Sequence, residues 1–119
     1  MKTRNLIYLT AIFSVLFISG CSSGSEYDAF AQCLTDSEAK FYGAFWCPHC
    51  QTQKNMFGSS FEHVNYIECS LPDRSDQTEI CKEAGIKVYP TWEFADGKRI
   101  EGQISLLQLS QLSGCNLAG

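Results

Sequence analysis

Apolar residues recur at helical spacing in two parts of the chain. Between residues 27 and 34 they fall three or four positions apart, which predicts a short amphipathic helix. Leucines repeat in the same way near the C-terminus, with Ser105 as the expected N-cap and Gly114 as the expected end of the helix. Each of these helices should lay one apolar face on a core.

Two further helices are predicted from residues that favour helix ends. One should begin at Cys47 or Pro48, because proline is well tolerated in the first turn, and stop before Gly58. The other should cover residues 77–84, with Asp76 as its N-cap and a glycine as its end.

Four strands are expected between these helices. Residues 39–46 form an aromatic-rich apolar run, and residues 64–69 form a second segment of strand length. Residues 91–95 and 98–101 flank Asp96-Gly97, a strong signal for a hairpin. Helices and strands that alternate and then end in a hairpin and a helix predict an α/β fold, with a mixed four-stranded sheet flanked by helices.

The first 20 residues have the layout of an export signal. Lys2 and Arg4 precede an almost wholly apolar stretch at residues 6–18. That stretch is short for a bilayer-spanning helix, which needs about 20 apolar residues. A charged start, a short apolar region and small residues before a cleavage site are typical of a secretory signal peptide.

The signal ends in Ile-Ser-Gly-Cys at residues 18–21, which resembles the bacterial lipobox. The resemblance implies that Cys21 is diacylated and becomes the first residue of the mature chain. Residues 21–26 would then be a tether and residues 27–119 a single domain. We therefore expect an extracytoplasmic lipoprotein held on a bacterial membrane by its N-terminal lipid. An ordinary signal peptide that happens to end near a cysteine is the alternative.

Charge and cysteine content narrow the function. The chain has 119 residues, 9 basic and 13 acidic, and removal of the first 20 leaves seven basic residues, a net charge of −6. Nucleic acid is not an expected partner, because phosphate binding needs clustered Lys and Arg. Seven cysteines indicate an oxidising compartment, a metal site or redox chemistry. With Cys21 set aside six remain, an even number, as three disulfides would require.

The sequence Trp46-Cys47-Pro48-His49-Cys50 carries the candidate chemistry. It lies where a predicted strand meets a predicted helix, so Cys47 should sit at a helix N-terminus that favours its thiolate. Cys47 is therefore the candidate nucleophile, and Cys50, one turn later, can resolve a mixed disulfide formed there. Pro48 fixes the turn, and a protonated His49 would further stabilise the thiolate. Trp46 is either a contact for substrates or a packing residue.

Several other interpretations of this motif fit its residues less well. A c-type haem would need a histidine where Gln51 stands, and a zinc ribbon would need a second close pair, whereas eleven residues separate Cys69 from Cys81. A purely structural Cys47–Cys50 bridge would close too short a loop to add much stability. A module that binds metal through these two soft ligands, or a non-catalytic adaptor, stays open beside a redox enzyme.

The strand, the Trp-Cys-Pro-His-Cys motif and Val-Tyr-Pro-Thr at residues 88–91 resemble a thioredoxin fold. The resemblance implies a cis peptide bond before Pro90, which would face the cysteine pair with Tyr89 beside it. The Pro-His dipeptide is closer to DsbA-type oxidants than to the Gly-Pro of thioredoxins. One position departs from the pattern: relatives often bury an acidic residue six positions before the first cysteine, where this chain has Phe41.

More narrowly, residues 30–115 are similar to the thioredoxin-like domain fused to bacterial vitamin K epoxide reductase homologues. The residues that carry this similarity are 41–51, 66–69, Cys81, 85–86 and 89–93. It implies a thiol–disulfide oxidoreductase that forms disulfides in exported client proteins and is reoxidised by a quinone-linked membrane oxidoreductase, here a separate protein. An extracytoplasmic reductase or isomerase would carry the same motifs. No cofactor and no metal are expected.

The same resemblance implies a structural disulfide between Cys69 and Cys81. A second redox pair that relays electrons is the alternative. Cys33 and Cys115 then remain near the two ends of the domain, where we expect them to staple the termini together. Otherwise they are free thiols or form intermolecular bonds.

Overall fold

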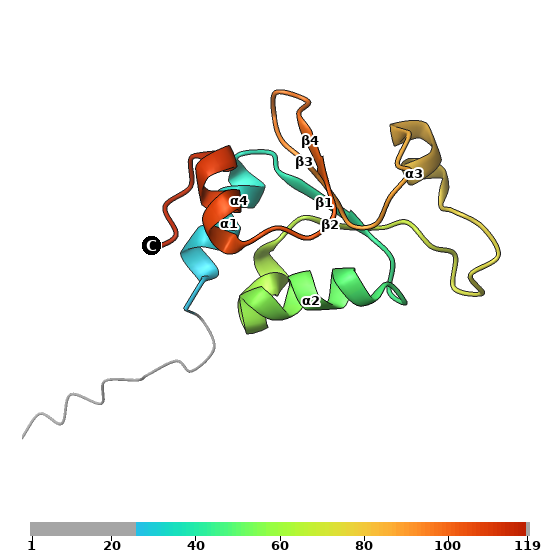
Figure 1. The fold of residues 1–119 in the computed structure, drawn as a ribbon, viewed down its shortest axis with the longest axis horizontal. Coiled ribbons are helices and arrows are strands. Elements are labelled where there is room, and N and C mark those ends of the chain that lie inside the picture. The colour runs from blue at the N-terminus through green and yellow to red at the C-terminus, as the bar shows by residue number, and fades with distance from the viewer. Residues whose placement is uncertain (1–25, 119) are drawn as a thin grey trace, which may run out of the picture.

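The computed structural model describes residues 26–118, with helices and strands in alternation (Figure 1). The predicted signal peptide and the predicted lipidation site at Cys21 lie outside these residues. Within the described part, no helix has the length and apolar character needed to cross a bilayer. The elements, in chain order, are α1 (Asp28–Asp36), β1 (Lys40–Gly43), α2 (Pro48–Phe57), the 3₁₀ helix η1 (Gly58–His63), β2 (Tyr66–Glu68), α3 (Glu79–Ala84), β3 (Thr91–Glu93), β4 (Arg99–Glu101) and α4 (Leu106–Ser113).

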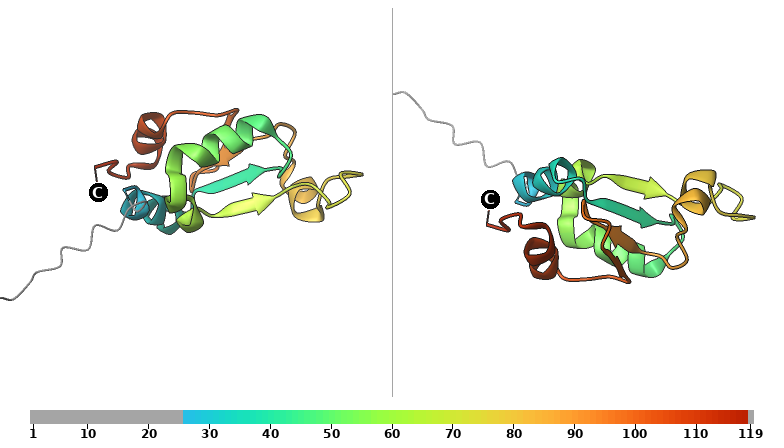
Figure 2. Two further views of the ribbon diagram at one scale, coloured as in Figure 1. Left: turned by 90° about the horizontal axis from the view of Figure 1, so that it is seen from below. Right: turned by 90° about the horizontal axis from the view of Figure 1, so that it is seen from above.

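The four strands form one mixed sheet in the order β2-β1-β3-β4. β1 runs parallel to β2 and antiparallel to β3, and β3 and β4 form the predicted antiparallel hairpin. α2 covers one face of the sheet, α1 and α4 lie together at one end, and α3 lies beyond the other end (Figures 1 and 2). The predicted α/β architecture is confirmed, and it is compatible with a thioredoxin-like fold.

Local signals explain most helix ends. Ser105 accepts from the Gln108 backbone N–H while the Gln108 side chain accepts from the Ser105 N–H, a reciprocal cap that fixes the start of α4. Gly114 ends the same helix with φ 76°, in the left-handed region that glycine enters without strain. Both ends match the prediction for α4.

Several elements differ in extent from the prediction, and β2 and β3 are shorter than expected. β1 ends at Gly43 rather than at residue 46, because the next residues turn the chain into α2. α3 begins at Glu79 rather than at residue 77, and its N-cap is Thr78 rather than the predicted Asp76, because Gln77 pairs with Ser70 in an isolated β-bridge. η1 was not predicted: Gly58 ends α2 as expected, but the chain winds on as a 3₁₀ helix.

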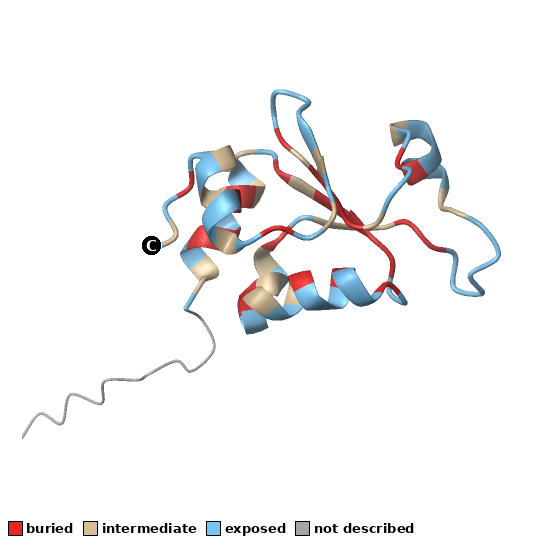
Figure 3. Ribbon diagram, viewed as in Figure 1, coloured by how far each residue is buried: buried red, intermediate tan, exposed pale blue. Residues whose placement is uncertain are grey.

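The core lies between α2 and the sheet and extends beneath α1 and α4 (Figure 3). Phe41 is fully buried in β1, and its ring centroid lies 4.7 Å from that of Trp92 in β3. Phe41 is thus an aromatic packing residue at the centre of the sheet. The largest fully buried apolar side chains of the core are Phe30, Leu34, Phe41, Phe57, Trp92 and Leu109.

Candidate functional site

Cys47 is the N-cap residue of α2, at the point where the chain leaves the sheet. Its Sγ accepts the Cys50 backbone N–H at 3.2 Å, so the sulfur takes the place of a capping oxygen. Backbone N–H groups at a helix start carry partial positive charge, which favours a thiolate at this atom. The structure thus places Cys47 at the helix N-terminus, as the sequence predicted.

Cys50 occupies a different environment, although it lies within the same turn. It is 0 % exposed, whereas Cys47 keeps 5 % of its surface. Burial, with the side-chain bond to Cys47, raises the pKa of Cys50 to about 12. Cys50 is therefore held as a thiol at neutral pH, and it needs a proton acceptor before it can attack.

The segment before β3 closes the site opposite Cys47. The Tyr89–Pro90 peptide bond is cis, as the thioredoxin resemblance implied, and the Cys47 thiol lies 3.7 Å from the Tyr89 carbonyl oxygen. The Tyr89 hydroxyl accepts a hydrogen bond of 2.7 Å from the Gln77 side-chain amide. These contacts fix the Tyr89 carbonyl beside the reacting sulfur.

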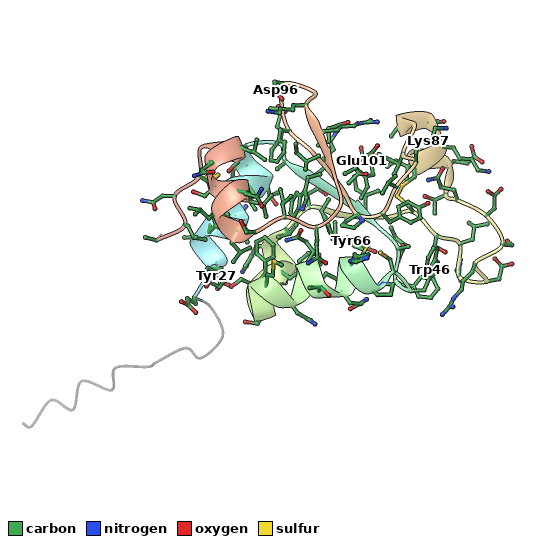
Figure 4. All side chains as sticks on the ribbon, in the orientation of Figure 1. Tyr27, Trp46, Tyr66, Lys87, Asp96 and Glu101 are labelled. Atoms are coloured by element: carbon green, nitrogen blue, oxygen red, sulfur yellow. A yellow bond between two sulfur atoms is a disulfide. The ribbon has the colours of Figure 1, made fainter. Side chains whose placement is uncertain are left out.

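Trp46 packs on one edge and is open on the other. Its indole N–H donates to the Ser70 hydroxyl at 2.8 Å, and its ring meets that of Tyr89 edge-on with centroids 6.0 Å apart. The residue nevertheless stays 42 % exposed, beside the first turn of α2 (Figure 4). An exposed indole next to the nucleophile offers an apolar contact to another polypeptide.

Pro48 and His49 form the exposed first turn of α2. Pro48 is its first residue, as expected for proline at a helix start. His49 Nδ1 lies 3.1 Å from the Gln103 side-chain oxygen, a partner between β4 and α4. Nothing in the sequence pattern marked Gln103, because it is more than 50 residues away in a segment without a motif.

Gly43 is a site residue that sequence analysis missed. A Cβ atom there would lie 3.1 Å from Cys50 Sγ and 3.0 Å from Tyr66 Cε2, too close on both sides. Glycine therefore lets the buried thiol and the Tyr66 ring rest directly on β1. A glycine within a predicted buried strand is a known sign of such close approach, so the signal was present.

The other four cysteines of the described residues form two disulfides. One joins Cys69, just after β2, to Cys81 in α3. The other joins Cys33 in α1 to Cys115, which follows α4. Cys47 and Cys50 are free thiols, so the structure shows the reduced form of the pair. Among residues 26–118, no three His, Cys, Asp or Glu residues gather as they would to hold a metal ion.

Comparison with known proteins points to the same chemistry. No family model matches the chain. Over 101 residues it is 42 % identical to the thiol-disulfide oxidoreductase LTO1 of Arabidopsis thaliana. The similarity supports a thiol oxidoreductase. It covers 81 % of this chain but only 27 % of LTO1, so the chain spans less than a third of the length of that relative.

Proposed function

We propose that the chain is a thiol–disulfide oxidoreductase that exchanges disulfides with client proteins through Cys47 and Cys50. The observation that carries the proposal is the position of Cys47 Sγ. It accepts the Cys50 N–H at 3.2 Å, lies at the start of a helix and faces the Tyr89 carbonyl. The similarity to LTO1 supports the same reaction class.

In the disulfide-forming direction, a client thiolate attacks Cys47 Sγ of the oxidised pair. The Cys47–Cys50 bond breaks, Cys50 leaves with the electron pair and takes up a proton, and a mixed disulfide joins the client to Cys47. A second client thiolate then attacks the client sulfur of that bond and releases Cys47. Two electrons have passed from the client, which gains a disulfide, to the enzyme, which gains two thiols.

The expected net direction is oxidation of exported, cysteine-containing proteins. Two features support it: the helix N-terminus at Cys47, and His49 two residues later, which would stabilise the thiolate when protonated. Stabilising the reduced form makes a dithiol pair more oxidising. A membrane oxidoreductase related to vitamin K epoxide reductase would reoxidise the pair, and lipidated Cys21 would keep the enzyme close to it.

The reduction potential of the Cys47–Cys50 pair tests the direction. Equilibration with glutathione buffers should give a value near that of DsbA, about −120 mV, if the protein is an oxidant. A value near that of thioredoxin, about −270 mV, would contradict the oxidising role and favour a reductase. A His49→Ala variant should shift the potential toward the reducing side, while Gln103→Ala should shift it less.

Turnover with insulin and a small-molecule thiol tests the reaction class itself. The wild-type chain should accelerate reduction of the insulin disulfides, and Cys47→Ser should lower that rate to the uncatalysed background. A Cys33→Ser/Cys115→Ser variant is the control, because it removes cysteines from the other end of the sheet and leaves the first turn of α2 unchanged. If the wild-type chain shows no acceleration, the proposed function is wrong.

A further inference from the structure

The resolving thiol needs a proton acceptor that Cys47 cannot provide at the moment of attack. In the reduced enzyme Cys50 shares a side-chain hydrogen bond with Cys47, which contributes to its raised pKa. In the mixed disulfide the Cys47 sulfur is bonded to the client and has no negative charge to receive a proton. Phe41, buried in β1, has an apolar ring that cannot accept a proton, so the acceptor must lie elsewhere.

Strand β2 supplies the polar groups on this side of the sheet. Tyr66 pairs with Phe41 and Glu68 pairs with Gly43 in the parallel β1–β2 register. Side chains two residues apart on a strand point to the same face, so Tyr66 and Glu68 both lie beneath α2. A Cβ atom on Gly43 would lie 3.0 Å from Tyr66 Cε2 and 3.1 Å from Cys50 Sγ, so the ring edge and the thiol both approach β1 at Gly43. Tyr66 itself lies between the sheet and α2 (Figure 4).

These groups are connected by contacts. The Tyr66 hydroxyl donates to Glu68 Oε1 at 3.2 Å, and the Lys54 ammonium lies 3.9 Å from the centroid of the Tyr66 ring. Lys54 comes one helical turn after Cys50 on α2, so its charge also stabilises a Cys50 thiolate. Glu68 is only half-buried, which allows it to exchange a proton with solvent.

We propose that Glu68, through the Tyr66 hydroxyl, accepts the proton of Cys50 when Cys50 resolves the mixed disulfide. This inference rests on the proposed function. The titratable groups around Cys50 are Cys47 and Lys54 from α2 and Tyr66 from β2, with Glu68 bonded to the Tyr66 hydroxyl. The β1 residues on that face do not titrate.

Resolution of the mixed disulfide begins with two coupled proton transfers. The Cys50 proton passes to the Tyr66 oxygen while the Tyr66 proton passes to the Glu68 carboxylate, which becomes a carboxylic acid. The Cys50 thiolate attacks Cys47 Sγ, and the client sulfur leaves with the electron pair of the broken bond. Glu68 then releases its proton to solvent. In the oxidising direction the same groups return a proton to Cys50 as it leaves.

Stopped-flow mixing with one equivalent of dithiobisnitrobenzoate isolates this step. Cys47 displaces the first coloured thionitrobenzoate, and Cys50 displaces the second when it resolves the mixed disulfide. The full chain is used in a Cys21→Ser background, so that residue 21 adds no thiol. The first phase reports on Cys47 alone and serves as an internal control.

The second phase should slow roughly 10²-fold near neutral pH in Glu68→Gln and in Tyr66→Phe, because a loss of this size is usual when a general acid–base group is removed. Tyr66→Phe removes the hydroxyl and keeps the ring. The deficit should shrink as pH rises, because hydroxide can then remove the Cys50 proton. Glu101→Gln, on the strand at the opposite edge of the sheet, should behave as wild type. Unfolding midpoints of all variants check that each is folded.

A second phase as fast as wild type in Glu68→Gln would overturn the inference. So would a deficit equal at every pH, because a structural defect does not recover with alkali. If the wild-type chain itself gives no second phase, Cys50 does not resolve and the proposed function fails. These readouts therefore separate the two failures.

Discussion

The two ends of the sheet use cysteines in opposite ways. At one end, Cys33 and Cys115 join α1 to the segment after α4 across 82 residues. At the other end, Cys47 and Cys50 lie within one helical turn, where Cys47 caps α2. A bond that closes a long loop restrains the unfolded chain strongly, while a bond across three residues restrains it little and is free for exchange.

The third pair, Cys69 and Cys81, closes a loop of intermediate length. Cys69 and Cys81 are 12 residues apart and hold the exposed loop 71–76 beside the reactive end. Ser70, next to Cys69, receives the indole hydrogen bond of Trp46. This disulfide therefore supports the surroundings of Cys47 as well as the fold. Variants that lack one pair at a time can distinguish the roles of the three pairs.

Removal of the Cys33–Cys115 disulfide should give the largest loss of stability. Cys33→Ala/Cys115→Ala should lower the free energy of unfolding by about 4.5 kcal/mol, because the unfolded chain regains the freedom of a long loop. Chemical denaturation measures the loss. Exchange activity per folded molecule should be unchanged, and an equal fall in activity would break the contrast between the two ends.

Removal of the Cys69–Cys81 disulfide should lower stability less, but it should also change the exchange activity. Cys69→Ala/Cys81→Ala should cost about 3 kcal/mol, since the loop is shorter. The folded fraction should also exchange disulfides more slowly, because the Ser70 partner of Trp46 is less well held. Activity assays well below the unfolding midpoint measure this effect. Wild-type rates there would show that the loop does not support the site.

Gly43→Ala tests the close approach of Cys50 to the strand. The added methyl group meets Cys50 Sγ and the Tyr66 ring, so we expect destabilisation of about 1–3 kcal/mol, the usual cost of overpacking. The second thionitrobenzoate phase should slow as Cys50 shifts. The control is Gly97→Ala in the β3–β4 turn, which meets no atom and should affect unfolding through its φ of 84° but leave that phase unchanged.

The pH dependence of stability gives an effect confined to alkaline solution. The pKa of Cys50 rises from 9.0 to about 12 on folding, so the unfolded chain releases this proton first as pH increases. Stability from Cys50 is therefore present below pH 9.0 and lost toward about pH 12. Tyr66, whose pKa burial and Glu68 also raise, acts in the same direction. Cys50→Ala should flatten the alkaline fall only in part, and an unchanged slope would contradict the raised pKa.

The sequence predicted the parts of the molecule that depend on local signals. The ends of α4 and the site of Cys47 followed from capping and turn residues, and the sheet followed from alternating elements. The 3₁₀ helix and the late start of α3 could not be predicted, because contacts such as the Ser70–Gln77 bridge set them.

The chemistry of the site shows the same division. The Cys-Pro-His-Cys motif marks its own reactive atoms, so spacing alone identified the cysteine pair. The Tyr66–Glu68 contact depends on the register of β2 against β1 and on the position of α2 above them. Such placement across the sheet leaves no local pattern, and only the folded arrangement brings these groups beside Cys50.

Trapping with Cys50→Ala tests most directly whether Cys47 exchanges disulfides with proteins. This variant can form a mixed disulfide at Cys47 but cannot resolve it. We predict conjugates with other exported proteins that disappear on reduction and are missing from Cys47→Ser/Cys50→Ala. Conjugates that persist in the double variant, or a Cys50→Ala chain that captures nothing while wild type is folded and reduced, would contradict the account.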